Sequence, residues 1–213
     1  MEANNAMMRD FLGRDDLDFR LDLPVNEAFA ARARGIVSGA FGGAVPERFA
    51  IVAPGARWAT KKWPAEFFLA VIASLARRMP DLKFLLAGTK DEAEDAAVIL
   101  AEAAAAGLPV VSVCGKTGVG DLMEVVRLSS LMICNDSGPM HIAAALGVPV
   151  AAVFGPTDPV LTGPYCEKKS VFVPETACIR CFLRYCKDSK CHGLVDPEAV
   201  AESSCKLLQK ERS

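Results

Sequence analysis

The chain has 213 residues, 52% of them hydrophobic, with a formal net charge of −2 and a pI near 5.8, values typical of a globular protein. Lysines and arginines form no long run, which argues against a nucleic-acid-binding surface. No apolar stretch reaches the roughly 18 residues that cross a bilayer, and the first residues lack the basic and apolar regions of a signal peptide. We therefore predict a cytoplasmic protein with one main domain.

Taken in chain order, the first 48 residues differ from the rest. They predict two short helices, over residues 3–12 and 26–38, followed by a glycine-rich stretch. Connecting structure and a disordered terminus are both compatible with this composition. No strand is predicted there.

From residue 49 onward, apolar runs alternate with helical segments. The strands predicted in this part are 49–53, 83–88, 110–114, 131–135, 150–155 and 170–173. The best supported helices are 65–79, 91–105, 138–146 and 197–210. This alternation predicts an α/β fold, a Rossmann-like parallel sheet with helices on both faces.

Polar residues at positions 135–141 lie between a predicted strand and a predicted helix. Ligands of open parallel sheets collect beyond the carboxyl ends of the strands, and N–H groups at a helix start suit a phosphate. Ser137 can add a donor, Gly138 permits a tight turn, and His141 falls on the first helical turn. Asp136 would repel a phosphate, so we expect it to bind sugar hydroxyls or backbone N–H groups. An ordinary helix cap and a core histidine remain the alternative interpretation.

Two other strand ends carry residues that suit the same ligand. After the first strand, Lys61 and Lys62 can counter a diphosphate as point charges. After the second, the carboxylate of Glu92 can accept both ribose hydroxyls. Each segment alone is equally compatible with a solvated loop or helix start. Other residues that frame the first of these loops are Arg57, Trp58 and Trp63.

In this order, APGARWATKKWP, AGTKDE and CNDSGPMHIAAALGVPVAAVFGPTDP resemble the C-terminal nucleotide-sugar-binding domain of glycosyltransferase family 9, the ADP-heptose:lipopolysaccharide heptosyltransferases. The resemblance covers most of residues 49–210. It implies one half of a two-domain GT-B fold. It also implies inverting, metal-independent transfer of heptose from ADP-heptose to a lipid-linked core oligosaccharide, with peripheral association at the inner face of the inner membrane.

The resemblance further implies a set of residues that surround the donor. For the diphosphate these are Lys61, His141 and the backbone amides of Ser137 and Gly138. Glu92 would hold the ribose and Asp136 the heptose. Secondary donor-binding candidates are Lys62 and Met140.

A GT-B enzyme also has an N-terminal half, which carries the acceptor site and the carboxylate that acts as base. Residues 1–48 resemble the end of that half and the interdomain linker, and residues 49–213 resemble the donor domain. Inverting transfer needs a base within hydrogen-bond reach of the attacking hydroxyl, and we find no candidate for it in this sequence. We therefore expect the chain alone to be inactive as a transferase.

A cysteine-rich loop, residues 177–193, spaces four cysteines as C-x2-C-x4-C-x4-C. They are Cys178, Cys181, Cys186 and Cys191. Four thiolates can close around zinc, although zinc sites usually separate two close pairs by a longer arm. Structural thiols or disulfides, a structural zinc and a reactive role all stay open.

Two other functions are compatible with the sequence. A GT-B sugar-nucleotide epimerase or hydrolase would share the crevice, but it needs acid and base groups on both walls. A non-catalytic module would instead bind zinc through the cysteines and a protein partner through the helix ends.

Overall fold

The computed structural model describes residues 13, 23–176, 178, 180–188 and 190–209. Within this part, six parallel strands form one sheet in the order β3-β2-β1-β4-β5-β6. The strands are β1 (Phe49–Ala53), β2 (Lys83–Leu86), β3 (Val110–Ser112), β4 (Leu131–Asn135), β5 (Val150–Val153) and β6 (Lys169–Phe172). The strand order reverses between β1 and β4, which is the Rossmann arrangement. The predicted fold class is confirmed.

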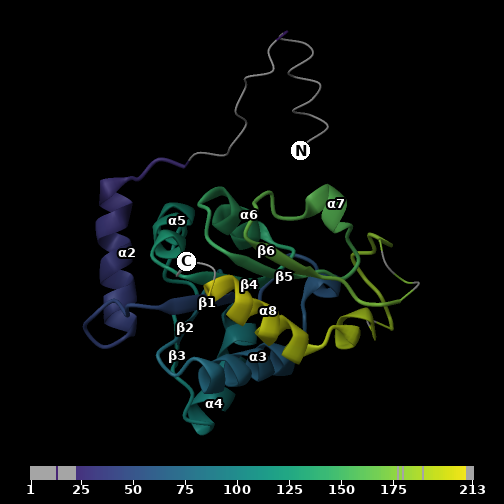
Figure 1. The fold of residues 1–213 in the computed structure, drawn as a ribbon, viewed down its shortest axis with the longest axis horizontal. Coiled ribbons are helices and arrows are strands. Elements are labelled where there is room, and N and C mark those ends of the chain that lie inside the picture. The colour runs from purple at the N-terminus through teal and green to yellow at the C-terminus, as the bar shows by residue number, and fades with distance from the viewer. Residues whose placement is uncertain (1–12, 14–22, 177, 179, 189, 210–213) are drawn as a thin grey trace.

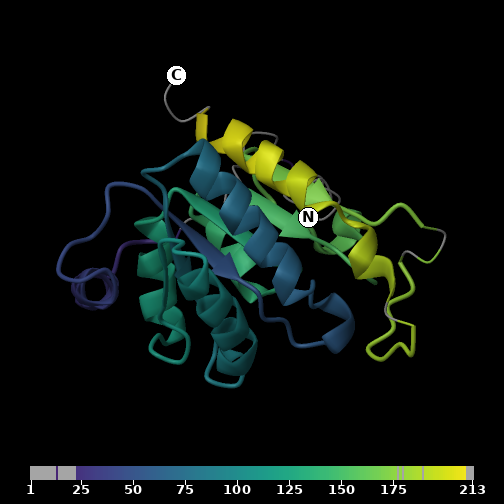
Figure 2. The same cartoon turned by 90° about the horizontal axis from the view of Figure 1, so that it is seen from below.

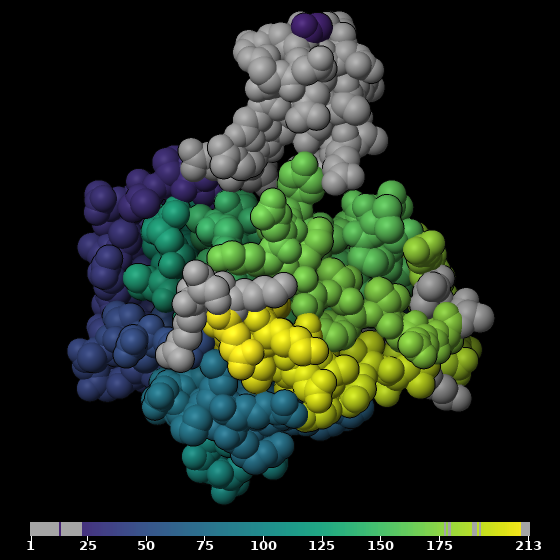
Figure 3. Space-filling model, in the orientation of Figure 1, coloured from purple at the N-terminus to yellow at the C-terminus, as the bar shows by residue number. Residues whose placement is uncertain are grey.

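Helices cover both faces of the sheet (Figures 1 and 2). One face carries α3 (Ala65–Arg78), α4 (Ala93–Ala105) and α8 (Pro197–Gln209). The other carries α2 (Glu27–Ala40), α5 (Val119–Arg127) and α6 (Gly138–Ala145). Short elements complete the described chain: η1 (Ala59–Lys61), α7 (Pro159–Thr162) and η2 (Lys190–Leu194). Figure 3 shows α8, in yellow, lying beside α3 on the surface.

The central strands consist almost entirely of apolar residues, which are buried on both faces of the sheet. In β1 the side chains alternate between the two helical layers, since successive residues of a strand point to opposite faces. Phe49 and Ile51 pack towards α2, α5 and α6, whereas Ala50 and Val52 pack towards α3, α4 and α8. Burial on both faces explains why these strands are continuous apolar runs.

The first described helix, α2, packs against α5. The Arg32 guanidinium donates to both oxygens of Asp121, at 2.9 and 2.7 Å, and this hydrogen-bonded cation lowers the pKa of the Asp121 carboxyl. The helix predicted at 26–38 is present as α2, which ends two residues later than predicted. The helix predicted at 3–12 lies outside the described residues, and the boundary at residue 48 stays a prediction.

Elsewhere the predicted elements agree with the structure within about two residues at each end. The helix α5 had no predicted range. Within the described residues, no helix is both long and apolar enough to cross a membrane.

Candidate functional site

A cleft of about 920 Å³ opens beyond the carboxyl ends of β1, β2, β3 and β4, at the point where the strand order reverses. Because parallel strands end at the same edge of the sheet, loops that are distant in sequence meet there. The cleft is lined by most of the residues that the sequence singled out: Arg57, Trp58, Lys61, Lys62, Glu92, Asp136, Ser137, Gly138 and His141.

Lys61 and Asp136 form the most buried ion pair in this lining. Lys61 Nζ lies 2.7 Å from Asp136 Oδ2, and the two side chains are only 16% and 4% exposed. Lys61 Nζ also lies 4.6 Å from the centre of the Trp58 ring, within cation–π range. The lysine is therefore held by a carboxylate and an aromatic face, with its charge at the wall of the cleft.

Lys62 is placed differently from Lys61. Its Nζ contacts Asp95 Oδ2 at 2.6 Å, and both side chains are more than a third exposed. Exposed pairs of this kind contribute little to stability. Lys62 therefore lines the cleft with its charge paired to Asp95.

The start of α6 offers backbone donors to the cleft. Among the described residues, the N–H groups of Ser137 and Gly138 have no acceptor. Ser137 makes no cap hydrogen bond, and its hydroxyl donates to the Asn135 carbonyl at 3.2 Å. Ser137 thus occupies the N-cap position of α6 without a side-chain cap hydrogen bond, and the free N–H groups fit an anion.

Gly138 plays a different part from the predicted one. Its φ is not in the left-handed region, and a Cβ added there would meet no atom within 4 Å. The tight turn thus does not require glycine. The missing side chain instead leaves open space at the cleft wall, where a ligand can approach the backbone.

Glu92 lies at the N-terminus of α4. Its Oε2 accepts hydrogen bonds from the N–H and the hydroxyl of Thr89, at 2.8 and 3.1 Å. The loop after β1 passes so close that a Cβ on Gly55 would lie 2.1 Å from Glu92 Cδ. Glycine is needed at 55 for this close approach, a requirement that the sequence did not reveal.

Asn135, at the end of β4, ties the loop after β1 to the sheet. Its side chain is fully buried; Oδ1 accepts from the Trp63 N–H at 3.0 Å, and Nδ2 donates to the Pro54 carbonyl at 2.7 Å. The loop that carries Lys61 is thus anchored at both ends. This role was missed because the partners lie 72 and 81 residues away in the chain.

One predicted contact is corrected by the structure. The Met140 side chain is fully buried in the core beneath α6 and does not line the cleft. Its neighbour His141 lies exposed at the cleft, since successive helical residues point about 100° apart.

The segment after β3 also lines the cleft and was not predicted. It contributes Thr117, Gly118, Val119 and Leu122. The glycines of GKTGVGD, which follow the predicted strand 110–114, are a loop signal that could have indicated this segment.

The cysteine-rich loop packs against the loop that follows β1. The Thr60 hydroxyl donates to the Leu183 carbonyl at 2.7 Å, and the Arg184 guanidinium lies 5.0 Å from the Trp58 ring centre. Within the described residues, no three His, Cys, Asp or Glu side chains come together as a metal site. Of the candidate ligands, Cys178, Cys181 and Cys186 are exposed and Cys191 is partly buried.

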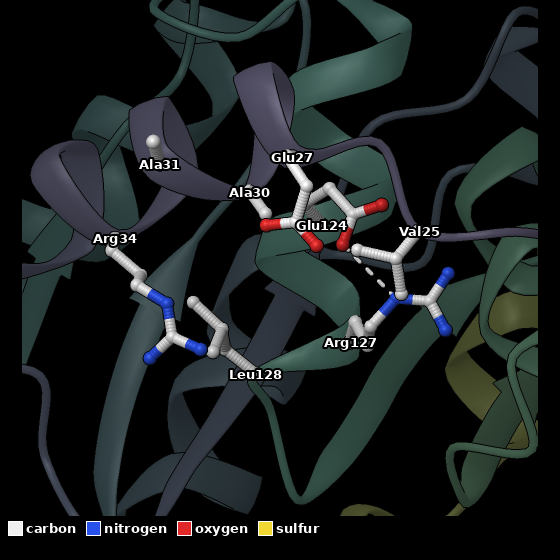
Figure 4. Close-up of a pocket in the computed structure, with 8 residues that line it drawn as sticks. All are labelled: Val25, Glu27, Ala30, Ala31, Arg34, Glu124, Arg127 and Leu128. Atoms are coloured by element: carbon white, nitrogen blue, oxygen red, sulfur yellow. Dashed lines mark hydrogen bonds and ion pairs between the residues drawn. The ribbon is translucent and has the colours of Figure 1, made fainter.

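A second, smaller hollow of about 310 Å³ lies between α2 and α5 (Figure 4). Glu124 and Arg127 pair within it at 3.0 Å. None of the predicted site residues lines it.

The family model described as glycosyltransferase family 9 (heptosyltransferase) matches residues 2–192. The chain belongs to glycosyltransferase family 9. Among the similar proteins, lipooligosaccharide heptosyltransferase 2 of Campylobacter jejuni is 32% identical over 161 residues, which are 73% of this chain and 50% of that protein. Lipopolysaccharide heptosyltransferase 1 of Pseudomonas aeruginosa is 29% identical, over 62% of this chain and 36% of that protein. The chain thus spans about half the length of the Campylobacter jejuni relatives.

Solved structures show the same fold. The E. coli ADP-heptose lipopolysaccharide heptosyltransferase II superposes with a TM-score of 0.71 at 25% identity, covering 93% of this chain and 57% of that one. A family 9 glycosyltransferase from Veillonella parvula gives a TM-score of 0.80 at 24% identity, covering 94% and 57%. These similarities confirm the predicted fold: the chain forms one half of the GT-B architecture.

Proposed function

We propose that this chain is the donor-binding half of an inverting heptosyltransferase of lipopolysaccharide core assembly. ADP-heptose would be the donor and a lipid-linked core oligosaccharide the acceptor, at the cytoplasmic face of the inner membrane. The observation that supports this most directly is the single cleft onto which Lys61, Glu92 and Asp136 converge from three different strand ends. The family 9 membership gives independent support.

The diphosphate would lie between Lys61 and the start of α6. Lys61 supplies a point charge, and the N–H groups of Ser137 and Gly138 supply fixed donors. A helix N-terminus contributes only about 0.3–1 kcal/mol per charge at an exposed site, so the direct hydrogen bonds must carry most of the affinity. These groups would also stabilise the diphosphate as it leaves, which is where charge develops in the transfer.

Asp136 suits the sugar better than it suits catalysis as a base. In an inverting displacement the acceptor hydroxyl attacks the anomeric carbon while the bond to the diphosphate breaks, and a base takes the hydroxyl proton. Asp136 is engaged by Lys61 at 2.7 Å and is 4% exposed, on the donor side of the cleft. We therefore assign Asp136 to the sugar hydroxyls and expect the base from a second domain.

We expect the transfer to need no metal cofactor. A divalent cation would neutralise the leaving diphosphate in a metal-dependent transferase, and Lys61 with the α6 N–H groups supplies positive charge at that place. Donor affinity should accordingly be the same with added magnesium and with a chelator. A structural zinc at Cys178, Cys181, Cys186 and Cys191 stays a separate proposal, to be tested by metal analysis of the purified chain.

The test is calorimetric titration of the chain with ADP, ADP-heptose and a UDP-sugar. We expect ADP and ADP-heptose to bind and the UDP-sugar to bind much more weakly. Lys61→Ala should weaken ADP and ADP-heptose alike, by about tenfold or more, since it removes a charge-assisted contact. Lys206→Ala, on the exposed face of α8, is the matched control and should change neither.

Asp136→Asn separates the two parts of the donor. It should weaken ADP-heptose and leave ADP unchanged or bound more tightly, because a carboxylate beside the diphosphate is removed. Asp81→Asn, at an exposed position outside the cleft, is its control. Absence of all nucleotide binding would overturn the proposal. Release of free heptose, or a change in its stereochemistry, without an acceptor would favour the hydrolase or epimerase instead.

A further inference from the structure

The Asp136 carboxylate is held on one side by three groups. Its Oδ2 accepts from Thr157 Oγ1 at 2.6 Å, pairs with Lys61 Nζ at 2.7 Å and lies 3.4 Å from Thr162 Oγ1. Asp136 and Thr157 are almost fully buried, 4% and 2% exposed. Hydrogen bonds to a charged, buried group are among the stronger ones in proteins.

The other carboxylate oxygen, Oδ1, is left for a ligand. Within the described chain no hydrogen-bond partner is found for Asp136 Oδ1. Among the described residues, the one side-chain polar atom that is both buried and without a partner is Ser204 Oγ. Asp136 Oδ1 also has no partner in this part of the chain, so it must be accessible to solvent. Asp136 lines the cleft. The carboxylate thus presents one occupied and one accessible oxygen.

Thr157 and Thr162 contribute unequally to this arrangement. A threonine hydroxyl has one hydrogen to donate. Thr162 Oγ1 lies 3.2 Å from the Asp158 carbonyl and 3.4 Å from Asp136 Oδ2, so its hydrogen is shared or points to the nearer carbonyl. Thr157 Oγ1 donates its hydrogen to Asp136 Oδ2 at 2.6 Å. Thr157 is therefore the main hydroxyl that fixes the carboxylate.

The loop that carries Thr157 is braced by the cysteine-rich loop. The Phe182 N–H donates to the Pro156 carbonyl at 2.9 Å, and Arg180 Nε lies 3.0 Å from Asp158 Oδ2. These contacts flank position 157 on both sides. The position of the Thr157 hydroxyl thus depends on a segment that is distant in sequence.

We infer that Thr157 is a positioning residue for the sugar part of the donor. Its hydroxyl holds Oδ2 of Asp136 so that Oδ1 faces the sugar hydroxyls in a fixed direction, while Lys61 on the same Oδ2 stays beside the diphosphate. This inference rests on the proposed function, because it assigns Asp136 to the sugar. It predicts that Thr157 governs the gain in affinity from ADP to ADP-heptose and leaves the affinity for ADP itself unchanged.

The experiment measures dissociation constants of ADP and ADP-heptose for the chain and for Thr157→Val, Thr157→Ser and Thr162→Val. Thr157→Val keeps the shape and removes the donor, so the ratio of the two dissociation constants should shift towards ADP by about tenfold, the effect of losing a hydrogen bond to a charged group. Thr157→Ser should restore the ratio of the unaltered chain. Thr162→Val should shift it by less than Thr157→Val. Thr157→Ala replaces the valine variant if that one does not fold.

The outcomes separate the two levels of the argument. If the unaltered chain binds ADP-heptose no better than ADP, the assignment of Asp136 fails and the role of Thr157 fails with it. If the unaltered chain shows the gain and Thr157→Val keeps it, the role of Thr157 is overturned while the proposed function stands. An equal loss of ADP and ADP-heptose affinity in Thr157→Val would show a purely structural role and would also overturn the inference.

Discussion

Gly55→Ala should disable the proposed contact of Glu92 with the ribose without unfolding the protein. An added Cβ would lie 2.1 Å from Glu92 Cδ and 2.2 Å from Glu92 Oε1. The carboxyl group must therefore move by roughly 1 Å or more to reach ordinary contact distance. The backbone at Gly55 is not in the left-handed region, so alanine itself is not strained there. The flexible Glu92 side chain takes up the displacement.

The expected result is a loss of ADP affinity with little loss of stability. The free energy of unfolding should fall by less than about 1 kcal/mol, the usual range for a change absorbed by a partly exposed side chain. Affinity for ADP should fall by about tenfold, because hydrogen bonds to a charged group contribute about 1.5–3 kcal/mol. Urea denaturation and calorimetry measure the two quantities.

The control is Gly35→Ala in α2, where an added Cβ meets no atom within 4 Å and no cleft residue lies near in sequence. It should raise stability slightly, as alanine does inside a helix, and leave ADP affinity unchanged. In the Glu92→Ala background, Gly55→Ala should cost no further affinity, because both changes remove the same contact. Full additivity of the two losses would refute the reasoning.

Three further changes test other parts of the structure. Gly138→Ala should leave the melting temperature unchanged and weaken ADP several-fold in calorimetry, since its methyl group occupies open space at the cleft wall; unchanged ADP affinity would contradict this. Arg32 lowers the pKa of Asp121, so the stability from this pair is complete above about pH 4 and is lost as the pH falls through the folded-state pKa. Asp121→Asn should therefore lower the free energy of unfolding in urea at pH 7 and flatten its decline below pH 4, and an unchanged acid slope would refute the assignment. Thr60→Val removes the 2.7 Å hydrogen bond to the Leu183 carbonyl, so hydrogen exchange measured by mass spectrometry should speed up around Leu183 without a change in β1; unaltered exchange there would show that this contact does not hold the loop.

Much of the fold can be predicted from the sequence, because strands that are buried on both faces of the sheet appear as continuous apolar runs. Residues 131–135 are apolar up to Asn135, and polar residues follow at once. A parallel sheet brings such strand ends to one edge, so the meeting of Lys61, Glu92 and Asp136 could be predicted without knowing any distance. The helix α5 had no predicted range although it is amphipathic, because its nine residues are short for a periodicity argument.

The contacts that hold the site could not be predicted in this way. The approach of Gly55 to Glu92 and the bond from Thr157 to Asp136 depend on how far apart two loops lie, and neither has a local pattern. Met140 shows the opposite failure. A motif assigns neighbouring residues to one site, but helical rotation turns its side chain into the core.

The cleft is therefore formed without a ligand, because buried side chains behind its wall hold its loops in place. Asn135 anchors both ends of the loop that carries Lys61. Thr157 holds the carboxylate of Asp136, which pairs with Lys61. Such groups reduce the entropy that a ligand must offset when it orders a site. Lys61 already pairs with Asp136 at 2.7 Å. The diphosphate of the proposed donor would therefore share a lysine whose position is fixed and whose charge is partly neutralised by Asp136. If the cleft binds a nucleotide sugar as proposed, sugar hydroxyls that donate to the Asp136 carboxylate would further offset its repulsion of the phosphates, which would favour the nucleotide sugar over the bare nucleotide.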